Sequence, residues 1–204
     1  MADGALTDGQ IKDLARKMGL DLAFVDFKSD LVMQPIEYNK GYIVNLANDK
    51  DEKGRQQDGT HWVAFVIRKY PNGKLAPMYW DSYGCPAPKE ITDYIEHFTK
   101  VHEVPYNNKD VQSLLSGVCG YYCLAFLFFV LKWQGRCGEL YHDADAFIDL
   151  FDDLNKGIDF KKNEYRLKHF FRSNDPNERE KFPVNVDHIT RDDKDDITID
   201  TNFV

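Results

Sequence analysis

The sequence predicts an α+β fold: a mostly antiparallel central sheet, a buried helix that carries a candidate nucleophile, and flanking helices. Three observations predict it. Two runs rich in β-branched and aromatic residues, 61–70 and 75–81, flank a Pro-Asn-Gly turn and indicate a hairpin. An apolar run from Val118 to Leu131 is too short to span a membrane and indicates a buried core helix. The order of expected elements, helix, strands, helix, strand and then helices, is typical of this class.

Length and charge limit the number of domains and the classes of binding partner that the chain can have. The 204 residues suffice for one domain with a real core, which we place at 1–183, before an acidic C-terminal tail at 184–204 that we expect to be weakly ordered or draped on the surface. The net charge of -8 argues against a chain built to hold nucleic acid or an anionic membrane. The polar N-terminus lacks the pattern of a secretory signal, and the four cysteines are therefore expected to be free thiols in a reducing compartment.

Local signals place the elements of the first half. Thr7 to Gln10 form a capping box that opens a helix, and Gly19 closes it. Residues 42–46 are a short apolar strand candidate. Residues 48–60 are a charged surface loop that leads into the first strand of the hairpin.

The second half is expected to be mainly helical. Apolar residues recur at helical spacing over 91–98 and predict a helix after the hairpin. Residues 103–106 are an edge-strand candidate, because a proline there forbids a central position. The long apolar helix is expected from 119 to about 135, and two further helices over 143–154 and 164–172.

Cys119 is the candidate nucleophile. Glycines at 117 and 120 suit a tight loop that enters a helix, and the positive end of a helix dipole favours a thiolate. Taken alone, Cys119 would more often be a buried structural cysteine, which is the interpretation that we give to Cys123 and Cys137. Metal ligation is not predicted, because no Cys or His pair elsewhere has the spacing of zinc ligands.

Three other side chains have positions that suit acyl-transfer chemistry. His61 lies between a polar loop and an apolar strand, where a general base is held by the sheet and open to substrate. Asp81 ends the next strand, where a carboxylate can orient an imidazole. Gln112 precedes Cys119 by seven residues and can donate its amide to an oxyanion. Each has an ordinary alternative: a surface histidine, an aspartate that caps a turn, a surface glutamine.

The order His, acid, Gln and Cys resembles a known family. The segments 59–62, 80–84, 112–113 and 119–123 resemble the adenovirus-type maturation proteases (adenain) and the related ubiquitin-like-protein proteases. The resemblance covers about residues 40 to 135. It implies a papain-like cysteine protease fold in which Cys119 attacks, His61 is the acid and base, Asp81 orients it and Gln112 stabilises the oxyanion. It also implies that Trp62 and Gly120 bind substrate in a groove for small residues such as glycine, and that no metal or cofactor is needed.

The resemblance leaves two substrate classes. One is capsid or core precursor proteins, cleaved by a virus-encoded enzyme in the virion and the host cell interior. The spacing from Gln112 to Cys119 favours it, since this spacing is typically one residue shorter in the cellular branch, the ubiquitin-like-protein proteases.

The alternative substrate is a conjugate of a ubiquitin-like modifier. It is favoured by Asp81, where adenain has Glu, and by the lack of a cysteine over 100–111 that could form the activating disulfide of adenain. Acetyl transfer and an inactive binding module are further alternatives. The net charge argues against stimulation by DNA. We expect no membrane partner and a monomer.

The hairpin turn conflicts with this constellation. A two-residue turn at Asn72-Gly73 would point the side chains of His61 and Asp81 to opposite faces of the sheet, because side chains alternate along a strand. We therefore predict a loop longer than two residues, or a bulge, with the Asp81 carboxylate within hydrogen-bond reach of the His61 ring. The resting enzyme is expected to pair a Cys119 thiolate with a protonated His61.

Overall fold

The structure is a computed structural model that describes residues 5–51, 53–55, 59–132, 139–154, 160–174, 185–191 and 197–201, with side chains up to residue 171. The helices are α1 (Asp8–Lys17), α2 (Lys28–Leu31), α3 (Lys89–Thr99), α4 (Cys119–Lys132), α5 (Leu140–Ile148) and α6 (Phe160–Asn174). The strands are β1 (Leu22–Phe27), β2 (Gly41–Asn45), β3 (Trp62–Lys69), β4 (Leu75–Trp80), β5 (Asn185–Arg191) and β6 (Ile197–Thr201).

The central sheet has the strand order β1-β2-β3-β4. The β2–β3 and β3–β4 pairs are antiparallel and the β1–β2 pair is parallel, so the prediction of a mostly antiparallel sheet is confirmed. Strand β1 was not expected from the sequence. Its buried positions are adjacent rather than alternating, so it lacks the period of two that marks a half-buried strand.

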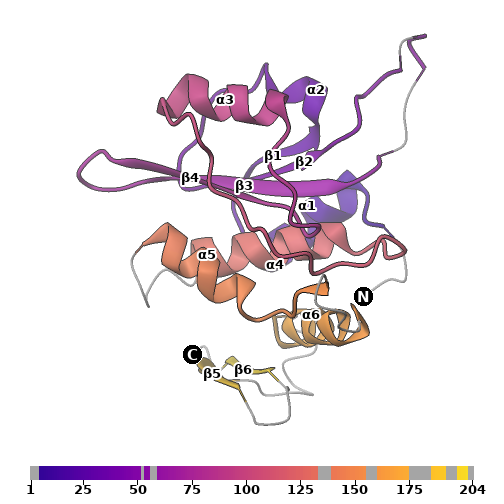
Figure 1. Cartoon of the computed structure of the whole chain (residues 1–204), viewed down its shortest axis with the longest axis vertical. Helices are drawn as coiled ribbons and strands as arrows, with labels where there is room; N and C mark the ends of the chain where they lie inside the picture. The colour runs from indigo at the N-terminus through magenta and orange to yellow at the C-terminus, as the bar shows by residue number, and fades with distance from the viewer. Residues whose placement is uncertain are drawn as a thin grey trace.

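The two faces of the sheet bury two separate apolar clusters. Ala64 and Val66 of β3 pack with residues of α1, α4 and α5, whereas Phe65 and Ile67 pack with residues of α3. Figure 1 shows the same arrangement, with α2 and α3 on one side of the sheet and α4 and α5 on the other. The period of two along β3 therefore places α4 against one face only.

Helix α4 is buried on all sides. Every residue from Cys119 to Leu131 is buried, as expected for a helix that lies between the sheet and the neighbouring helices (Figure 1). The Trp80 ring of β4 stacks on the Phe126 ring with centroids 5.3 Å apart. The predicted core helix is confirmed through Lys132, and the expected end near 135 lies outside the described residues.

A buried ion pair joins the sheet to this helical layer. The Arg68 guanidinium of β3 donates to the Asp143 carboxylate of α5 at 2.9 Å, and its other amino group donates to the Val130 carbonyl of α4. The helix was expected from about Asp143, but α5 begins at Leu140 and Asp143 lies in its first turn. Arg68 supplies the partner that lets this carboxylate be buried.

Other element boundaries agree with the sequence-based predictions where local signals are strong and differ from them where the signals are weak. The capping box at Thr7 is present, with the Gln10 amide N–H donating to the Thr7 hydroxyl at 3.2 Å. Helix α5 begins and ends earlier than 143–154, and α6 begins earlier than 164–172. The edge-strand candidate 103–106 is reduced to an isolated bridge from Tyr106 to Tyr79.

The segment 184–204 contains strands β5 and β6, which pair with each other in an antiparallel sheet. The sequence did not indicate them. The division of the chain at residue 183 stays a prediction.

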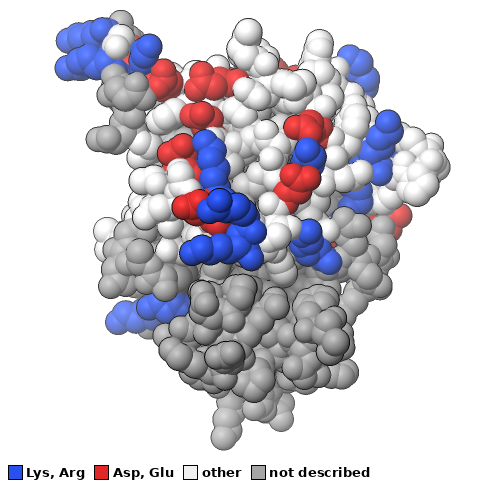
Figure 2. All heavy atoms as spheres, turned by 180° about the vertical axis from the view of Figure 1, so that it is seen from behind, with Lys and Arg blue, Asp and Glu red and all other residues white. Residues whose placement is uncertain are grey.

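On the face seen in Figure 2, Lys and Arg side chains lie among Asp and Glu side chains. Among the described residues, ion pairs near the surface include Lys12 with Asp8 at 3.0 Å and Lys40 with Glu37 at 2.5 Å. Such pairs contribute little to stability. Within the described residues, none of the helices has the length and apolarity needed to cross a membrane.

Candidate active site

The hairpin register brings His61 and Asp81 together. The last strand pair is Lys69 with Leu75, and the Tyr70 amide N–H donates to the Lys74 carbonyl, which leaves a three-residue loop. This loop shifts the register by one residue from that of a two-residue turn, and odd-numbered residues of both strands then share a face. The predicted longer loop is confirmed.

The contact itself is short and buried. His61 directly precedes β3, Asp81 directly follows β4, and His61 Nε2 lies 2.7 Å from Asp81 Oδ1. The side chains are 11% and 3% exposed. An ion pair of this kind is only weakly screened by water.

The second nitrogen of the His61 ring is available for a different partner. Nδ1 is buried and has no hydrogen-bond partner among the described residues. Burial lowers the pKa of His61, but the hydrogen bond that the ring donates to Asp81 and the interaction with Cys119 outweigh it and raise the pKa to about 9. Since Nε2 is used by Asp81, the geometry leaves Nδ1 for Cys119.

Cys119 is the first residue of α4, as the glycines around it predicted. It is 5% exposed and unpaired in a disulfide, like Cys85 and Cys123. Cys123 lies one turn further, where its thiol donates to the Trp62 carbonyl at 3.3 Å. That contact supports the structural interpretation of Cys123. Cys137 lies outside the described residues.

Two residues that the sequence analysis gave no role support the His61–Asp81 pair. The Tyr83 ring stacks on the His61 ring with centroids 4.4 Å apart, and the Tyr83 amide N–H donates to Asp81 Oδ1 at 2.9 Å. Asn107 is buried and bonds the Asp81 backbone twice, accepting from its N–H and donating to its carbonyl. The signal for Tyr83 was its place in the 80–84 segment; no local signal marks Asn107.

Gly84 lets the loop after β4 approach the loop that carries Asn107. Its φ is +69°, and a Cβ there would lie 2.9 Å from the Lys109 carbonyl carbon. A side chain at position 84 would therefore be strained and would clash with backbone. This glycine explains how segments far apart in sequence can share one site.

Gln112 is buried and its amide is oriented at both ends. The Ser82 hydroxyl donates to Gln112 Oε1 at 2.8 Å, and Gln112 Nε2 donates to the Ser116 carbonyl at 2.6 Å. An amide NH₂ has two donor hydrogens, so one remains to be directed at a ligand. Ser82, which precedes Tyr83, was also given no role from sequence.

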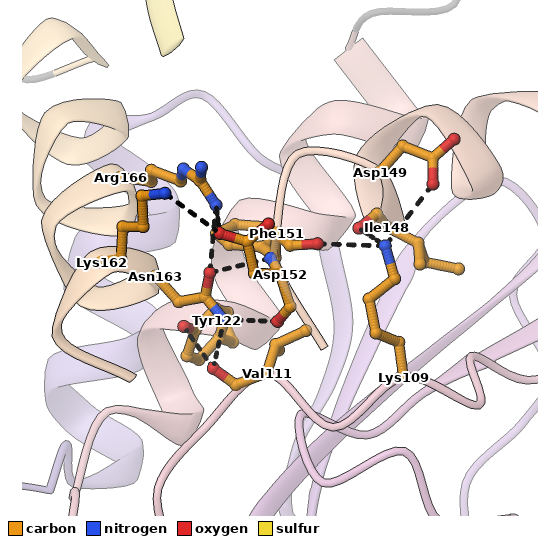
Figure 3. Close-up of polar contacts among 10 residues, drawn as sticks. All are labelled: Lys109, Val111, Tyr122, Ile148, Asp149, Phe151, Asp152, Lys162, Asn163 and Arg166. Carbon is orange, nitrogen blue, oxygen red and sulfur yellow. Dashed lines mark hydrogen bonds and ion pairs between the residues drawn. The ribbon is translucent and has the colours of Figure 1, made fainter. Parts of the chain in front are cut away.

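The loop before Gln112 is anchored by α4 and by the C-terminal third of the chain (Figure 3). The Val111 carbonyl accepts hydrogen bonds from the Tyr122 hydroxyl and from Asn163 Nδ2, both at 3.1 Å. Lys109 Nζ donates to the carbonyls of Ile148, the last residue of α5, and of Phe151, at 3.1 and 3.0 Å. The residues on both sides of Asp110 are thus held from α4, from α6 and from the end of α5 and the segment after it.

The predicted substrate-binding residues Trp62 and Gly120 meet the N-terminal segment. The Trp62 indole is 7% exposed and donates to the Leu6 carbonyl at 2.8 Å. A Cβ on Gly120 would lie 3.2 Å from the Leu6 side chain. Close packing accounts for both residues, and their role in substrate binding stays a prediction.

The described residues contain no group of three or more His, Cys, Asp or Glu side chains placed to hold a metal ion. The chemistry available at the site is that of a thiol, an imidazole, a carboxylate and an amide. Such a set can form and hydrolyse an acyl-enzyme.

Comparisons with known proteins give a distant likeness. No protein-family model and no curated protein matches the chain. Among solved structures it is similar to the ASFV pS273R protease, at a TM-score of 0.41 and 15% identity over 72% of this chain and 65% of that one. It is also similar to HopZ1a in complex with IP6 (TM-score 0.43, 15% identity, 67% of this chain and 47% of that one). A third is the Xanthomonas campestris effector XopD bound to ubiquitin (TM-score 0.39, 13% identity, 73% and 92%). The chain spans less than two thirds of the first two. Likeness at this level does not assign a reaction, so the reaction is argued from the geometry of the site.

Proposed function

We propose that this chain is a cysteine endopeptidase with Cys119 as nucleophile. One observation carries the proposal: the buried His61 ring bonds Asp81 through Nε2 and interacts with Cys119, beside the oriented amide of Gln112. This is the arrangement that a thiol protease needs, with a base between an orienting acid and a nucleophile. It also fits the order of motifs that resembles the adenain and ubiquitin-like-protein proteases.

The roles follow from these contacts. With a pKa of about 9, His61 is protonated at neutral pH and can hold a Cys119 thiolate as an ion pair. The thiolate attacks the scissile carbonyl carbon. The oxyanion accepts hydrogen bonds from the Gln112 amide and from the Cys119 backbone N–H, since the first N–H groups of a helix lack partners within it.

His61 then transfers its proton. Nδ1–H protonates the leaving amine as the C–N bond breaks, which leaves a thioester on Cys119. The neutral imidazole next takes a proton from water, whose oxygen attacks the thioester carbon. The thiolate leaves, the resting ion pair is restored, and the product carboxylic acid loses its proton to solvent.

The experiment that tests this proposal is covalent labelling of the full chain. A peptide that ends in a C-terminal glycine electrophile should add once to the wild-type protein, at Cys119 by peptide mapping. Cys119→Ala should lose the adduct and all peptidase activity, because the nucleophile is removed. Cys85→Ala and Cys123→Ser should keep both, since Cys85 is exposed and serine preserves the bond to Trp62. Labelling or turnover that survives in Cys119→Ala contradicts the proposal.

Two substrate classes remain, each favoured by a different residue feature. The spacing of Gln112 and Cys119 resembles the maturation proteases, which would make capsid or core precursors the substrates, in the virion and host cell. Asp81 is the acid of the ubiquitin-like-protein branch, and its short side chain already reaches His61 at 2.7 Å. Deconjugation of a ubiquitin-like modifier is therefore the second candidate.

A side-by-side assay separates these classes. The wild-type chain is incubated with ubiquitin-like conjugates and with precursor proteins that contain internal glycine sites, and Cys119→Ala serves as the blank. Release of an intact modifier supports deconjugation, and internal cleavage of precursors alone supports maturation. Transfer of an acetyl group in place of hydrolysis would support the alternative reaction on this scaffold.

A further inference from the structure

Two neighbouring leucines are exposed on the loop that links the catalytic candidates. Leu114 is 83% exposed and Leu115 is 96% exposed. Single exposed leucines are ordinary, but two adjacent exposed leucines beside a reactive site indicate a surface for binding another polypeptide. The loop runs from Gln112 to Cys119, so both of its ends are part of the candidate active site.

The loop has a defined conformation that displays these side chains. The Leu115 amide N–H donates to the Ser113 hydroxyl at 3.2 Å, and the Ser116 amide N–H donates to the Ser113 carbonyl at 3.0 Å. The Ser116 carbonyl accepts from Gln112 Nε2. The leucines therefore extend from a closed turn that is tied to the oxyanion amide itself.

We propose that Leu114 and Leu115 bind apolar side chains of the polypeptide substrate close to the scissile bond, and so set specificity. The inference rests on the proposed function. A polypeptide whose scissile carbonyl lies between Gln112 and Cys119 must pass this loop on one side, because Leu115 is bonded directly to the residue that contacts the Gln112 amide. A second copy of the chain is a less suitable occupant, since it would cover the entrance to the same site.

The test uses internally quenched peptides centred on Gly-Gly. One set carries leucine at the second and third positions before the scissile bond, one carries it at the second and third positions after, and the matched peptides carry serine. The wild-type chain should show a kcat/KM roughly ten-fold higher for leucine on one side, as expected for apolar contacts in a binding site. Leu114→Ser with Leu115→Ser should bring this ratio close to one.

The chain offers a matched control pair. Val32 and Met33 are 75% and 81% exposed, and they follow α2, which lies on the opposite side of the sheet from α4 (Figure 1). Val32→Ser with Met33→Ser also replaces two adjacent exposed apolar side chains by serine and should keep the wild-type ratio.

Three results would overturn the inference. The first is an equal ratio in the wild-type chain and the leucine variant, with cleavage that still depends on Cys119; the proposed function then stands. The second is a wild-type dimer that sedimentation shows to become monomeric in the leucine variant, which assigns the surface to a second copy. The third is a chain that cleaves no peptide and whose Cys119 is not labelled, because the proposed function then fails as well.

Discussion

His61 interacts with three side chains that come from two segments of the chain. Asp81 bonds Nε2, Tyr83 stacks on the ring, and Cys119 interacts with the imidazole from the start of α4. Burial destabilises the charged ring, but Asp81 and Cys119 together stabilise it by more, and the pKa of His61 rises to about 9. The charge of His61 at neutral pH is therefore a property of its partners.

This shift predicts how stability depends on pH. The unfolded pKa of histidine is about 6.5 and the folded value about 9, so the contribution of His61 is full below pH 6.5 and is lost as pH rises through 9. The free energy of unfolding should fall across this window by up to about 3 kcal/mol. Urea denaturation at a series of pH values measures it.

Two variants make the pH test specific. Asp81→Asn removes the largest contact that raises the pKa of His61, so the decline between pH 6.5 and 9 should become shallow. His102→Gln changes an exposed histidine that pairs with Glu96 and should keep the wild-type slope. A steep decline that persists in Asp81→Asn would show that another group causes it.

At the scale of elements, the C-terminal third of the chain supports the active-site loop. Asn163 of α6 is fully buried, and its Nδ2 donates to the Val111 carbonyl, next to Gln112, and to the Asp152 carbonyl at 2.7 Å. Its Oδ1 accepts from the Asp152 amide N–H at 2.9 Å. One side chain thus connects α6, the segment after α5 and the loop that carries the oxyanion amide (Figure 3).

Replacing this side chain should affect both stability and catalysis. Asn163→Ala leaves the buried Val111 carbonyl and the partly buried Asp152 carbonyl and N–H with fewer partners, and we expect it to lower the free energy of unfolding by roughly 2–4 kcal/mol. Because the Val111 carbonyl beside Gln112 loses one of its two hydrogen bonds, the oxyanion amide is held less firmly, and kcat should fall several-fold at a temperature where the variant is folded, with KM nearly unchanged.

The control for Asn163 lies on the same helix. Lys168 is exposed, so Lys168→Ala should change neither the unfolding free energy nor kcat measurably. If Asn163→Ala loses stability while the folded enzyme keeps the wild-type kcat, the side chain holds the fold together without positioning Gln112.

Across the whole molecule, the Arg68–Asp143 pair links the sheet to two helices of the layer below it. The side chains are 8% and 4% exposed, and Arg68 also bonds the Val130 carbonyl. A buried ion pair gains little over an apolar pair of the same size, but removing one partner leaves a buried charge without compensation.

Single and double substitutions of the Arg68–Asp143 pair should therefore differ in their effect on the free energy of unfolding. Arg68→Met should lower the free energy of unfolding by roughly 3–5 kcal/mol. Adding Asp143→Leu should recover part of that loss, because the isolated carboxylate is removed as well. Lys12→Ala at the exposed Asp8 pair should cost less than about 1 kcal/mol. Losses that simply add in the double variant would show that the two charges do not compensate each other.

The sequence by itself determined the elements that have a strong local period and the residues at their ends. The apolar run predicted α4, and the glycines predicted that Cys119 begins it. The longer loop between β3 and β4 was predicted from the pairing of His61 with Asp81, against the two-residue turn that Asn72-Gly73 favours. The helix prediction succeeds because an apolar run and the glycines before a helix are local features, and alternation along strands then fixes which loop length puts His61 and Asp81 on one face.

Only the tertiary structure decided which distant side chains complete the site. Asn107 bonds Asp81 across 26 positions, Asn163 bonds Val111 across 52, and the Leu6 carbonyl takes the Trp62 indole across 56. Strand β1 and the buried place of Asp143 also depend on remote partners. A hydrogen bond between distant segments leaves no period in the sequence, because it is set by how the layers pack and not by residues nearby.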